Sequence, residues 1–328
     1  MRRFADENEQ LAVRRLDDTE TYQVTNVINI AVIKDFYTVI DEEIGETVMV
    51  EKLLAHVDGK AKAAIDRMVL GVFFPPSAAD RMSLCEWLGL LFVRDPHTRR
   101  RDEAMADHTY KLDLSLVHDE ETARKRLRMN MGREPSDEEV AEMLAAVNDL
   151  DSFEITPHQN DLVTMMLEMG MHVALRLLRR NYTVVRFAKP GLVLSDRPMM
   201  LYQRRENRNP LMGVGIETAD EIWIPLDRKT LLVLHSDPIV GDCIMDAPPG
   251  FTIDECNRQL IFFASSEIYC HPDDFRRLEQ LDLPDPDRPL FTVSGGGWIR
   301  GGTDGVNKPA KRKRHRRYRR VTDTSSAD

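Results

Sequence analysis

The middle of the chain contains the stretch His158-Gln-Asn-Asp-Leu-Val-Thr-Met-Met-Leu-Glu-Met-Gly-Met-His-Val-Ala-Leu-Arg-Leu-Leu-Arg-Arg180, which has the pattern of an apolar helix. At about 100° per residue, its apolar side chains surround most of the helix axis. The narrow remaining sector holds polar residues, among them Glu168 and His172. A helix of this kind is expected to lie centrally in the fold. Its polar sector then either reaches the only solvent available to it or lines a cleft.

The residues before this helix are predicted to be largely helical from about residue 27 onward. Apolar residues recur at three- and four-residue spacings over 48–70, and Pro75-Pro76 ends that block. Ser136 and Glu139 have the spacing of a capping box, which marks the start of a helix. The further helices of this region are expected at 81–93, 122–131 and 136–150.

The residues after the central helix change to short segments of strand-forming residues, separated by Pro, Gly and Asp turns. Such closely spaced strands favour an antiparallel sheet. A small N-terminal hairpin is predicted between 10–16 and 21–25, across a polar turn. Helix is expected again over 251–266. The strands after the central helix are expected at 183–187, 192–194, 199–202, 221–224 and 231–235.

Together these patterns predict an α+β protein, in which a predominantly helical region packs on a small antiparallel sheet. We expect a single domain over 1–294 that is helical at 27–180, strand-rich at 181–240 and helical again at 251–280. Strands from both ends are needed to complete a sheet, so these regions are expected to share one core. The glycine-rich and basic segment 295–328 cannot bury itself and is expected to be a disordered tail.

Length and composition exclude several classes of protein. The chain has 328 residues, of which 42% are hydrophobic and 30% charged, which excludes collagen-like, low-complexity and fully disordered chains. The apolar runs fall short of the roughly 18 residues of a spanning helix, so no membrane segment is expected. The charged opening residues disfavour a secretory signal. Four scattered cysteines without a CxxC motif predict reduced thiols and a cytoplasmic protein.

The net charge of −10 is an average over two different parts of the chain. Residues 308–328 contain nine Lys and Arg against two Asp, whereas 1–307 contain 36 Lys and Arg against 53 acidic residues. A basic tail attracts polyanions by counterion release, so RNA or DNA is its expected partner over 308–320. The alternative is that the tail docks on the acidic body. The predicted contact residues are Lys311, Arg312, Lys313, Arg314, Arg316, Arg317, Tyr318, Arg319 and Arg320.

The sequence lacks the common catalytic and metal-binding motifs. It contains no HExxH, EF-hand loop, P-loop or GxSxG element, which excludes phosphoryl transfer by a P-loop. Glu168 and His172 share a helical face with His158 and Asp161, a pattern that suits either a divalent ion with a further ligand or a solvated stripe. We predict no metal site from these residues, and the sequence identifies no cofactor.

Two polar clusters form the candidate site. Ser195, Asp196 and Arg197 follow the apolar strand at 192–194 and precede a turn proline. The segment Arg94-Asp-Pro-His-Thr-Arg99 is placed at the C-terminal end of an apolar helix, where cations either complement the helix dipole or bind a phosphate or carboxylate. In an enzyme, the catalytic residues would be Asp196 as base or ligand, His97 and Ser195. The ligand-binding residues would be Arg94, Arg99, Arg197 and Asn257.

The sequence therefore leaves two classes of function open. One is a bacterial, cytoplasmic, hydrolase-like enzyme that associates with nucleic acid through its tail and has this polar cleft. The other is a non-catalytic interaction or structural protein in which the same residues are caps and buried pairs. The shared cleft requires Arg94, Asp196 and Asn257 to lie within about 12 Å of each other, since one small ligand must reach all three.

Several short segments, taken in order, carry a family resemblance. The segments are Arg2–Asp6, Val32–Tyr37, Trp87–Arg99, Leu194–Met199, Ile224–Leu226 and Asn257–Ser265. They are similar to the bacterial family catalogued as domain-of-unknown-function family 4238, over most of 2–270. The resemblance implies a shared fold and no particular reaction.

The chain departs from this family at two places. The family usually opens with His-x-x-Pro-x-x-x-Leu-Arg-x-Phe, and this chain begins inside that element at Arg2-Arg3-Phe4, without the His and Pro. Either the true start lies upstream of Met1 or this member lacks the element. The family's helix after the first aromatic motif often carries an Ile-Glu pair, whereas His56-Val57-Asp58 stands in that region here.

Overall fold

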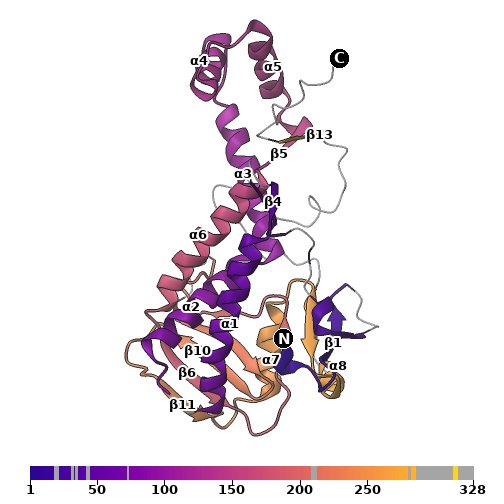
Figure 1. Ribbon diagram of the computed structural model, residues 1–328, viewed down its shortest axis with the longest axis vertical. Helices are drawn as coiled ribbons and strands as arrows, with labels where there is room; N and C mark the ends of the chain where they lie inside the picture. Colours follow the sequence, from indigo (N-terminus) through magenta and orange to yellow (C-terminus); the bar gives the residue numbers. More distant parts are fainter. Residues whose placement is uncertain are drawn as a thin grey trace. The chain divides into compact units, whose positions relative to one another are not determined.

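The computed structural model of the chain (Figure 1) describes residues 1–17, 22–30, 33, 36–41, 45–71, 74–207, 213–279, 282–285 and 313–316. The chain divides into two compact units, one formed by 1–95 with 165–307 and the other by 96–164 with 308–328. The single domain expected over 1–294 remains a prediction. No helix within the described residues is long and apolar enough to cross a membrane.

The first unit is built on a five-stranded sheet. Its strands are β6 Asn181–Arg186, β8 Met200–Tyr202, β9 Glu221–Asp227, β10 Thr230–His235 and β11 Cys243–Asp246, in the order β11-β6-β10-β9-β8. β6, β9 and β10 are buried at nearly every interior position, because both faces of the sheet are covered. Four strands run antiparallel, which confirms the predicted sheet, and β11 adds an edge strand parallel to β6.

Helices cover one face of this sheet (Figure 1). They are α1 Met49–Leu70, α2 Ala78–Val93 and the 165–177 part of α6 Gln159–Leu177. Leu88 of α2 and Leu177 of α6 are fully buried in one cluster with Tyr182, Ile222 and Leu232 of the sheet. The helices and the sheet of this unit thus share a core, as an α+β fold requires.

The contact between α2 and α6 depends on two glycines. A Cβ added at Gly89 would lie 2.2 Å from the carbonyl oxygen of Gly170, so only glycine permits this approach. Gly170 and Ala174 are buried here, and several of the longer apolar side chains lie on the outer side of the helix. Central helix α6 is therefore buried along one stripe, whereas the sequence predicted burial around most of its axis. The side chains left about half exposed are Met169, Met171 and Leu175.

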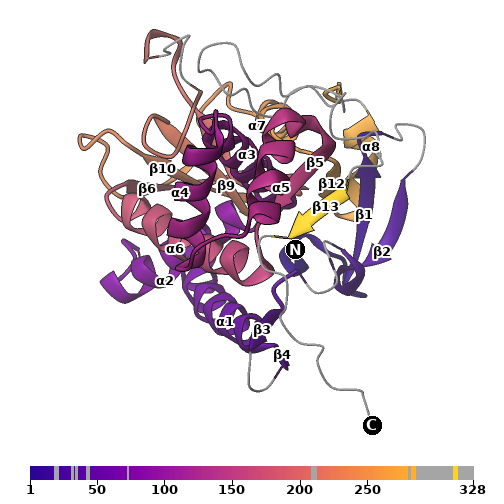
Figure 2. The same ribbon diagram turned by 90° about the horizontal axis from the view of Figure 1, so that it is seen from above.

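A second sheet in the same unit joins strands from both ends of the chain. Its strands are β1 Gln10–Arg15, β2 Gln23–Asn26, β7 Leu194–Ser195 and β12 Glu267–Cys270, in the order β2-β1-β12-β7. β1 and β2 form the predicted hairpin (Figure 2). The sequence predicted helix over 251–280, but β12 lies within that range, between α7 Ile253–Phe262 and α8 Phe275–Glu279. The strand forms there because Ile268, Tyr269 and Cys270 are buried while their backbone pairs with β1 and β7.

Shorter elements complete the first unit. β3 Val39–Asp41 and β4 Gly45–Thr47 pair as a small hairpin before α1. Thr252 caps α7, since its hydroxyl accepts a hydrogen bond from the backbone N–H of Glu255. Single 3-10 turns occur in both units, at Arg2–Phe4, Val27–Asn29, Leu150–Ser152, Arg205–Asn207 and Pro272–Asp274.

The second unit is mainly helical. It contains α3 Pro96–Leu114, α4 Glu120–Met131, α5 Asp137–Asn148, β5 Phe153–Thr156 and the start of α6. Ser136 and Glu139 form the predicted capping box. From the basic tail, β13 Lys313–Arg316 pairs in parallel with β5. The remainder of 295–328, predicted to be disordered, lies outside the described residues.

Candidate functional site

Asp196, predicted as a catalytic base or ligand, binds backbone donors. Its carboxylate accepts hydrogen bonds from the N–H groups of Ser265 at 2.8 Å, Ser266 at 2.7 Å and Glu267 at 3.3 Å. The Ser266 hydroxyl donates a further bond at 2.7 Å. These contacts join the end of β7 to the turn that precedes β12. Asp196 therefore holds two distant segments of the chain together.

Ser195 and Asn257 have similar backbone partners. The Ser195 hydroxyl donates to the carbonyl oxygen of Arg197 at 2.8 Å. The buried amide of Asn257 accepts from the N–H of Val193 at 3.1 Å and donates to the carbonyl oxygen of Gly191 at 2.8 Å. These are the contacts that the non-catalytic hypothesis expects of caps and buried pairs. The predicted catalytic role of Ser195 and binding role of Asn257 stay predictions.

The predicted arginines pair with carboxylates. Arg94 ends α2 and lies 3.5 Å from Asp58, while Arg197 lies 3.1 Å from the buried Asp95. Because Asp95 follows Arg94 directly, the Arg197 contact links the end of α2 to the segment that contains Ser195 and Asp196. The first unit thus contains Arg94 and Arg197 of the predicted cleft, and each of them is paired with a carboxylate.

His97 and Arg99 belong to the second unit, and their expected position was wrong. Pro96 begins α3, so His97 and Arg99 lie in the first turn of a new helix and not at the C-terminal end of α2. Proline suits a first helical position because it has no N–H to donate. His97 contacts Arg100 at 3.0 Å, and Arg99 binds Gln159 and lies 3.5 Å from Glu103.

Two further sets of residues are the helical stripe that was weighed as a metal site and the predicted nucleic-acid contacts. Glu168 and His172 are both exposed on α6. Among the described residues, no group of three or more His, Cys, Asp or Glu is placed to hold a metal ion. The side chains of all nine predicted nucleic-acid contacts, from Lys311 to Arg320, lie outside the described part of the chain.

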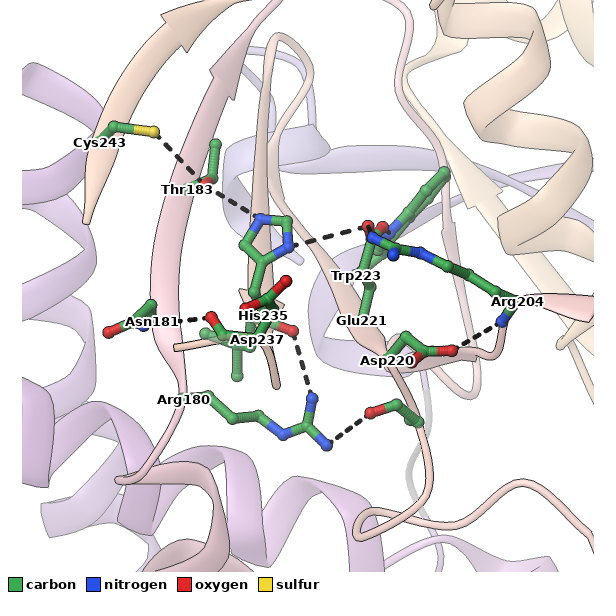
Figure 3. Close-up of polar contacts among 12 residues, drawn as sticks. Arg180, Asn181, Thr183, Arg204, Asp220, Glu221, Trp223, His235, Asp237 and Cys243 are labelled. Carbon is green, nitrogen blue, oxygen red and sulfur yellow. Dashed lines mark hydrogen bonds and ion pairs between the residues drawn. The ribbon is translucent and has the colours of Figure 1, made fainter. Parts of the chain in front are cut away.

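A different polar cluster crosses the five-stranded sheet at one end (Figure 3). Strand register places Glu221 of β9 opposite His235 of β10, and Thr183 of β6 opposite Cys243 of β11. Thr183 lies two residues after Asn181, the partner of His235, so the four side chains share one face of the sheet. We call Glu221, His235, Thr183 and Cys243 the polar row.

The polar row is continuous through its side chains (Figure 3). The Cys243 Sγ lies 3.5 Å from the Thr183 Oγ1, which lies 3.0 Å from the His235 Nε2. The His235 Nδ1 lies 3.7 Å from the Glu221 Oε1. The second Glu221 oxygen accepts a hydrogen bond from the Trp223 indole at 2.8 Å. A thiol is thus connected through one hydroxyl to an imidazole that faces a carboxylate.

Buried polar contacts hold this end of the sheet in place. The guanidinium of Arg180 donates to the carbonyl oxygens of Ile216 at 2.6 Å and Ala219 at 2.8 Å, which fixes the loop before β9. Asp242 accepts from the N–H of Tyr182 at 2.8 Å and pairs with Arg81, which fixes the residue before Cys243. Hydrogen bonds and an ion pair therefore hold the segments at both ends of the polar row.

Burial keeps His235 neutral. Its side chain is 15% exposed, and burial lowers the pKa of His235 below its ordinary value near 6.5. Glu221 opposes this effect, whereas Arg204 and Arg180 add to it. With the carboxylate facing Nδ1, the partners favour a proton on Nδ1 and a free lone pair on Nε2. The imidazole is then available as a base near pH 7.

Cys243 differs from the other three cysteines. It is exposed, whereas Cys85, Cys256 and Cys270 are buried. Burial raises the pKa of Cys85 to about 11 and of Cys256 and Cys270 to about 12, so these thiols stay protonated. Cys243 is therefore the thiol that an outside molecule can reach.

The polar row could not be predicted from the sequence, because no local motif marks it. Its residues come from four strands spread over 183–243, and only the pairing register brings them together. One signal was present: His235 ends the apolar run Leu231-Leu-Val-Leu, and Glu221 begins the strand beside it. Without the register, neither residue had a partner to suggest a site.

The comparison with protein families gives one match. The profile of a family described as protein of unknown function (DUF4238) matches residues 1–274. The chain belongs to this family. The match confirms the resemblance inferred from the short segments, and it includes every residue of the polar row and the Asp196 contacts. Comparison with curated proteins and with solved structures gives no match. The DUF4238 family assignment names no reaction, so the function is argued from the site.

Proposed function

We propose that this DUF4238 protein is a cytoplasmic hydrolase-like enzyme that uses Cys243 as its nucleophile. The observation that supports the proposal is the unbroken contact from the exposed Cys243 through Thr183 to the neutral His235, which Glu221 orients. A nucleophile, a base and a group that orients the base are the parts of nucleophilic acyl transfer. Four free cysteines suit the reducing cytoplasm that a thiol nucleophile needs.

The reaction follows from the order of these groups. The Cys243 thiol passes its proton to the Thr183 oxygen while the Thr183 hydroxyl passes its own to the His235 Nε2. The sulfur electron pair then forms a bond to a substrate carbonyl carbon, and the leaving group departs with the proton held by His235. A water molecule attacks the resulting thioester and gives its proton to the same relay, which releases the acid and restores the thiol.

Ester hydrolysis tests this proposal. The full chain is expected to hydrolyse 4-nitrophenyl acetate with multiple turnovers, and Cys243→Ala should lower the rate at least tenfold because the nucleophile is lost. Met245→Ala is the matched control, since Met245 is the next exposed side chain on the same face of β11. Equal rates for the two variants, or no turnover by the wild-type chain, would contradict the proposal.

Nucleic-acid association through the tail is a second candidate function. Eight of the ten residues 311–320 carry a positive charge, which supports binding by counterion release. The parallel pairing of β13 with β5 favours the alternative, in which the tail docks on its own chain. These two alternatives predict opposite effects of tail truncation on nucleic-acid binding.

Nucleic-acid binding measured over a series of salt concentrations distinguishes these two alternatives. We expect the full chain to bind a fluorescent 20-mer of deoxythymidine with a log–log salt slope of about −6, from about 0.7 per charge for eight charges. Deletion of 308–328 should remove this binding. If the truncated chain binds as tightly as the full one, the tail plays no part in nucleic-acid association. If truncation increases binding, the tail acts as a docked inhibitor.

A further inference from the structure

The outer side of α6 exposes a group of large apolar side chains. Met165, Met169, Met171 and Leu175 are between 37% and 52% exposed, and all four belong to the first unit. Their spacing along one helix makes a contiguous patch, whereas exposed apolar residues of an ordinary surface are scattered singly. A helix with apolar residues around most of its axis is normally covered on all sides. This side of α6 therefore has the composition of an interface.

Helical geometry defines the centre of this patch. Gly170 faces α2, where an added Cβ would meet the side chain of a leucine. At 3.6 residues per turn, Glu168 and His172 each lie about 160° around the axis from Gly170, and Met165 and Leu175 about 140°. These four residues form a narrow strip on the side of α6 that is turned away from α2. We call Met165, Glu168, His172 and Leu175 the outer stripe.

The outer stripe has the spacing of a seam between two helices. Its residues follow one another at intervals of three, four and three, as the core positions of a coiled coil do. Residues at this spacing on two helices interdigitate when the axes cross at about 20°. Met169 and Met171 flank the seam, and the flexible thioether of methionine adapts to an apposed surface. The stripe is therefore suited to pair with another helix.

The order of residues in the outer stripe makes it complementary to itself. An apolar residue stands five positions from Gly170 on each side, and a polar residue stands two positions away on each side. The polar residue is Glu168 before the glycine and His172 after it. In an antiparallel pair of two α6 helices, each carboxylate thus faces an imidazole of the other copy. A two-fold interface requires this self-complementarity, whereas a parallel pair would place carboxylate against carboxylate.

The two polar side chains of the stripe are available for such a contact. In the part of the chain that the structure describes, neither the Glu168 nor the His172 side chain makes a hydrogen bond or an ion pair. Arg176, one turn further along α6, is different, because it already pairs with Glu217 at 2.6 Å. The outer stripe is therefore not occupied by charges of its own unit.

We propose that two copies of this chain associate through the outer stripe, with their α6 helices antiparallel. Met165 of each copy packs against Leu175 of the other, and Glu168 of each copy faces His172 of the other. Burial of the apolar side chains supplies the affinity, and the polar pairs set the orientation. The association does not involve the polar row and is independent of the hydrolase proposal.

Sedimentation equilibrium of the full chain over a range of concentrations tests this proposal. The wild-type chain should form a species with twice the mass of one chain. His172→Glu should raise the dissociation constant about tenfold or more, because it places a second carboxylate opposite Glu168. His56→Glu is the matched control, since His56 is an exposed histidine on α1. Leu175→Ser should raise the dissociation constant about threefold or more, and Leu53→Ser, at a similarly exposed leucine of α1, should leave it unchanged.

Two double variants test the antiparallel orientation. Glu168→Lys combined with His172→Glu should restore the wild-type dissociation constant, because opposite charges again face each other. In a Cys243→Ala background, Met165→Cys combined with Leu175→Cys should form a disulfide between two copies, whereas either cysteine alone should not. The two positions are about 15 Å apart along one helix, which is too far for a disulfide within a single copy.

Three results would overturn the proposal. The first is a wild-type chain that sediments with the mass of one chain at every concentration. The second is an equal dissociation constant for His172→Glu and His56→Glu, which would place the contact on another surface. The third is cross-linking of the single-cysteine variants as efficiently as the double variant, which would show that the helices are not antiparallel. Circular dichroism of each variant verifies that its helix content is that of the wild-type chain.

Discussion

Asp196→Ala is expected to lower the free energy of unfolding by about 2–4 kcal/mol, measured by urea denaturation. The substitution removes the acceptor for the N–H groups of Ser265, Ser266 and Glu267 and for the Ser266 hydroxyl. Hydrogen bonds to a charged group each contribute about 1.5–3 kcal/mol, and water replaces those at the more exposed donors. The decrease in the free energy of unfolding is therefore smaller than the summed contributions of the four hydrogen bonds.

Asp17→Ala is the control for this prediction. Asp17 accepts two hydrogen bonds from Arg15, also beside the second sheet, but both side chains are largely exposed. Its loss should leave the urea midpoint nearly unchanged, since water screens exposed pairs. If Asp196→Ala keeps the wild-type midpoint and abolishes ester hydrolysis, Asp196 acts in the reaction as the sequence analysis proposed, and the structural role is wrong.

Thr183→Val is expected to slow the alkylation of Cys243 by iodoacetamide at least tenfold at pH 7, measured by mass spectrometry of the labelled peptide. Valine keeps the shape of threonine but removes the hydroxyl that connects the thiol to His235. Base assistance typically raises rates by about 10²–10⁴, so its loss is measurable. The buried cysteines should react slowly in both proteins.

Thr230→Val is the matched control, because Thr230 is another buried threonine of the same sheet and has no part in the polar row. It measures how far the loss of a buried threonine hydroxyl slows Cys243 alkylation when the contacts from Cys243 through Thr183 to His235 are intact. Equal slowing in Thr183→Val and Thr230→Val would assign the effect to a general loosening of the sheet.

Much of the fold could be predicted from the sequence, because local patterns determine it. The spacing of apolar residues in α1, the capping box at Ser136 and the continuous apolar run of β10 each depend only on neighbouring residues. Strand β12 could not be predicted in this way. Its four residues form a strand because β1 and β7 flank them, and that pairing is a long-range contact.

The candidate site was harder to predict for the same reason. Asp196 was singled out from the sequence as a candidate base or ligand after a strand, but its backbone partners at 265–267 are distant in sequence. Glu221 and His235 are ordinary polar residues until the register places them opposite each other. Motif searches detect residues at fixed spacing, whereas this row exists only after four strands have paired.

The pH profile of Cys243 alkylation tests the proposed relay most directly. His235 must be neutral to accept a proton, and burial lowers its pKa below 6.5, with Glu221 and Asp237 opposing and Arg204 and Arg180 supporting the shift. The wild-type rate should therefore stay nearly level from pH 8 down to about pH 6.5 and fall only below that, as His235 becomes protonated. Thr183→Val should instead show a profile that no longer follows the protonation of His235, because the hydroxyl that connects the thiol to the imidazole is absent. Identical pH profiles for the two proteins across this range would contradict the account.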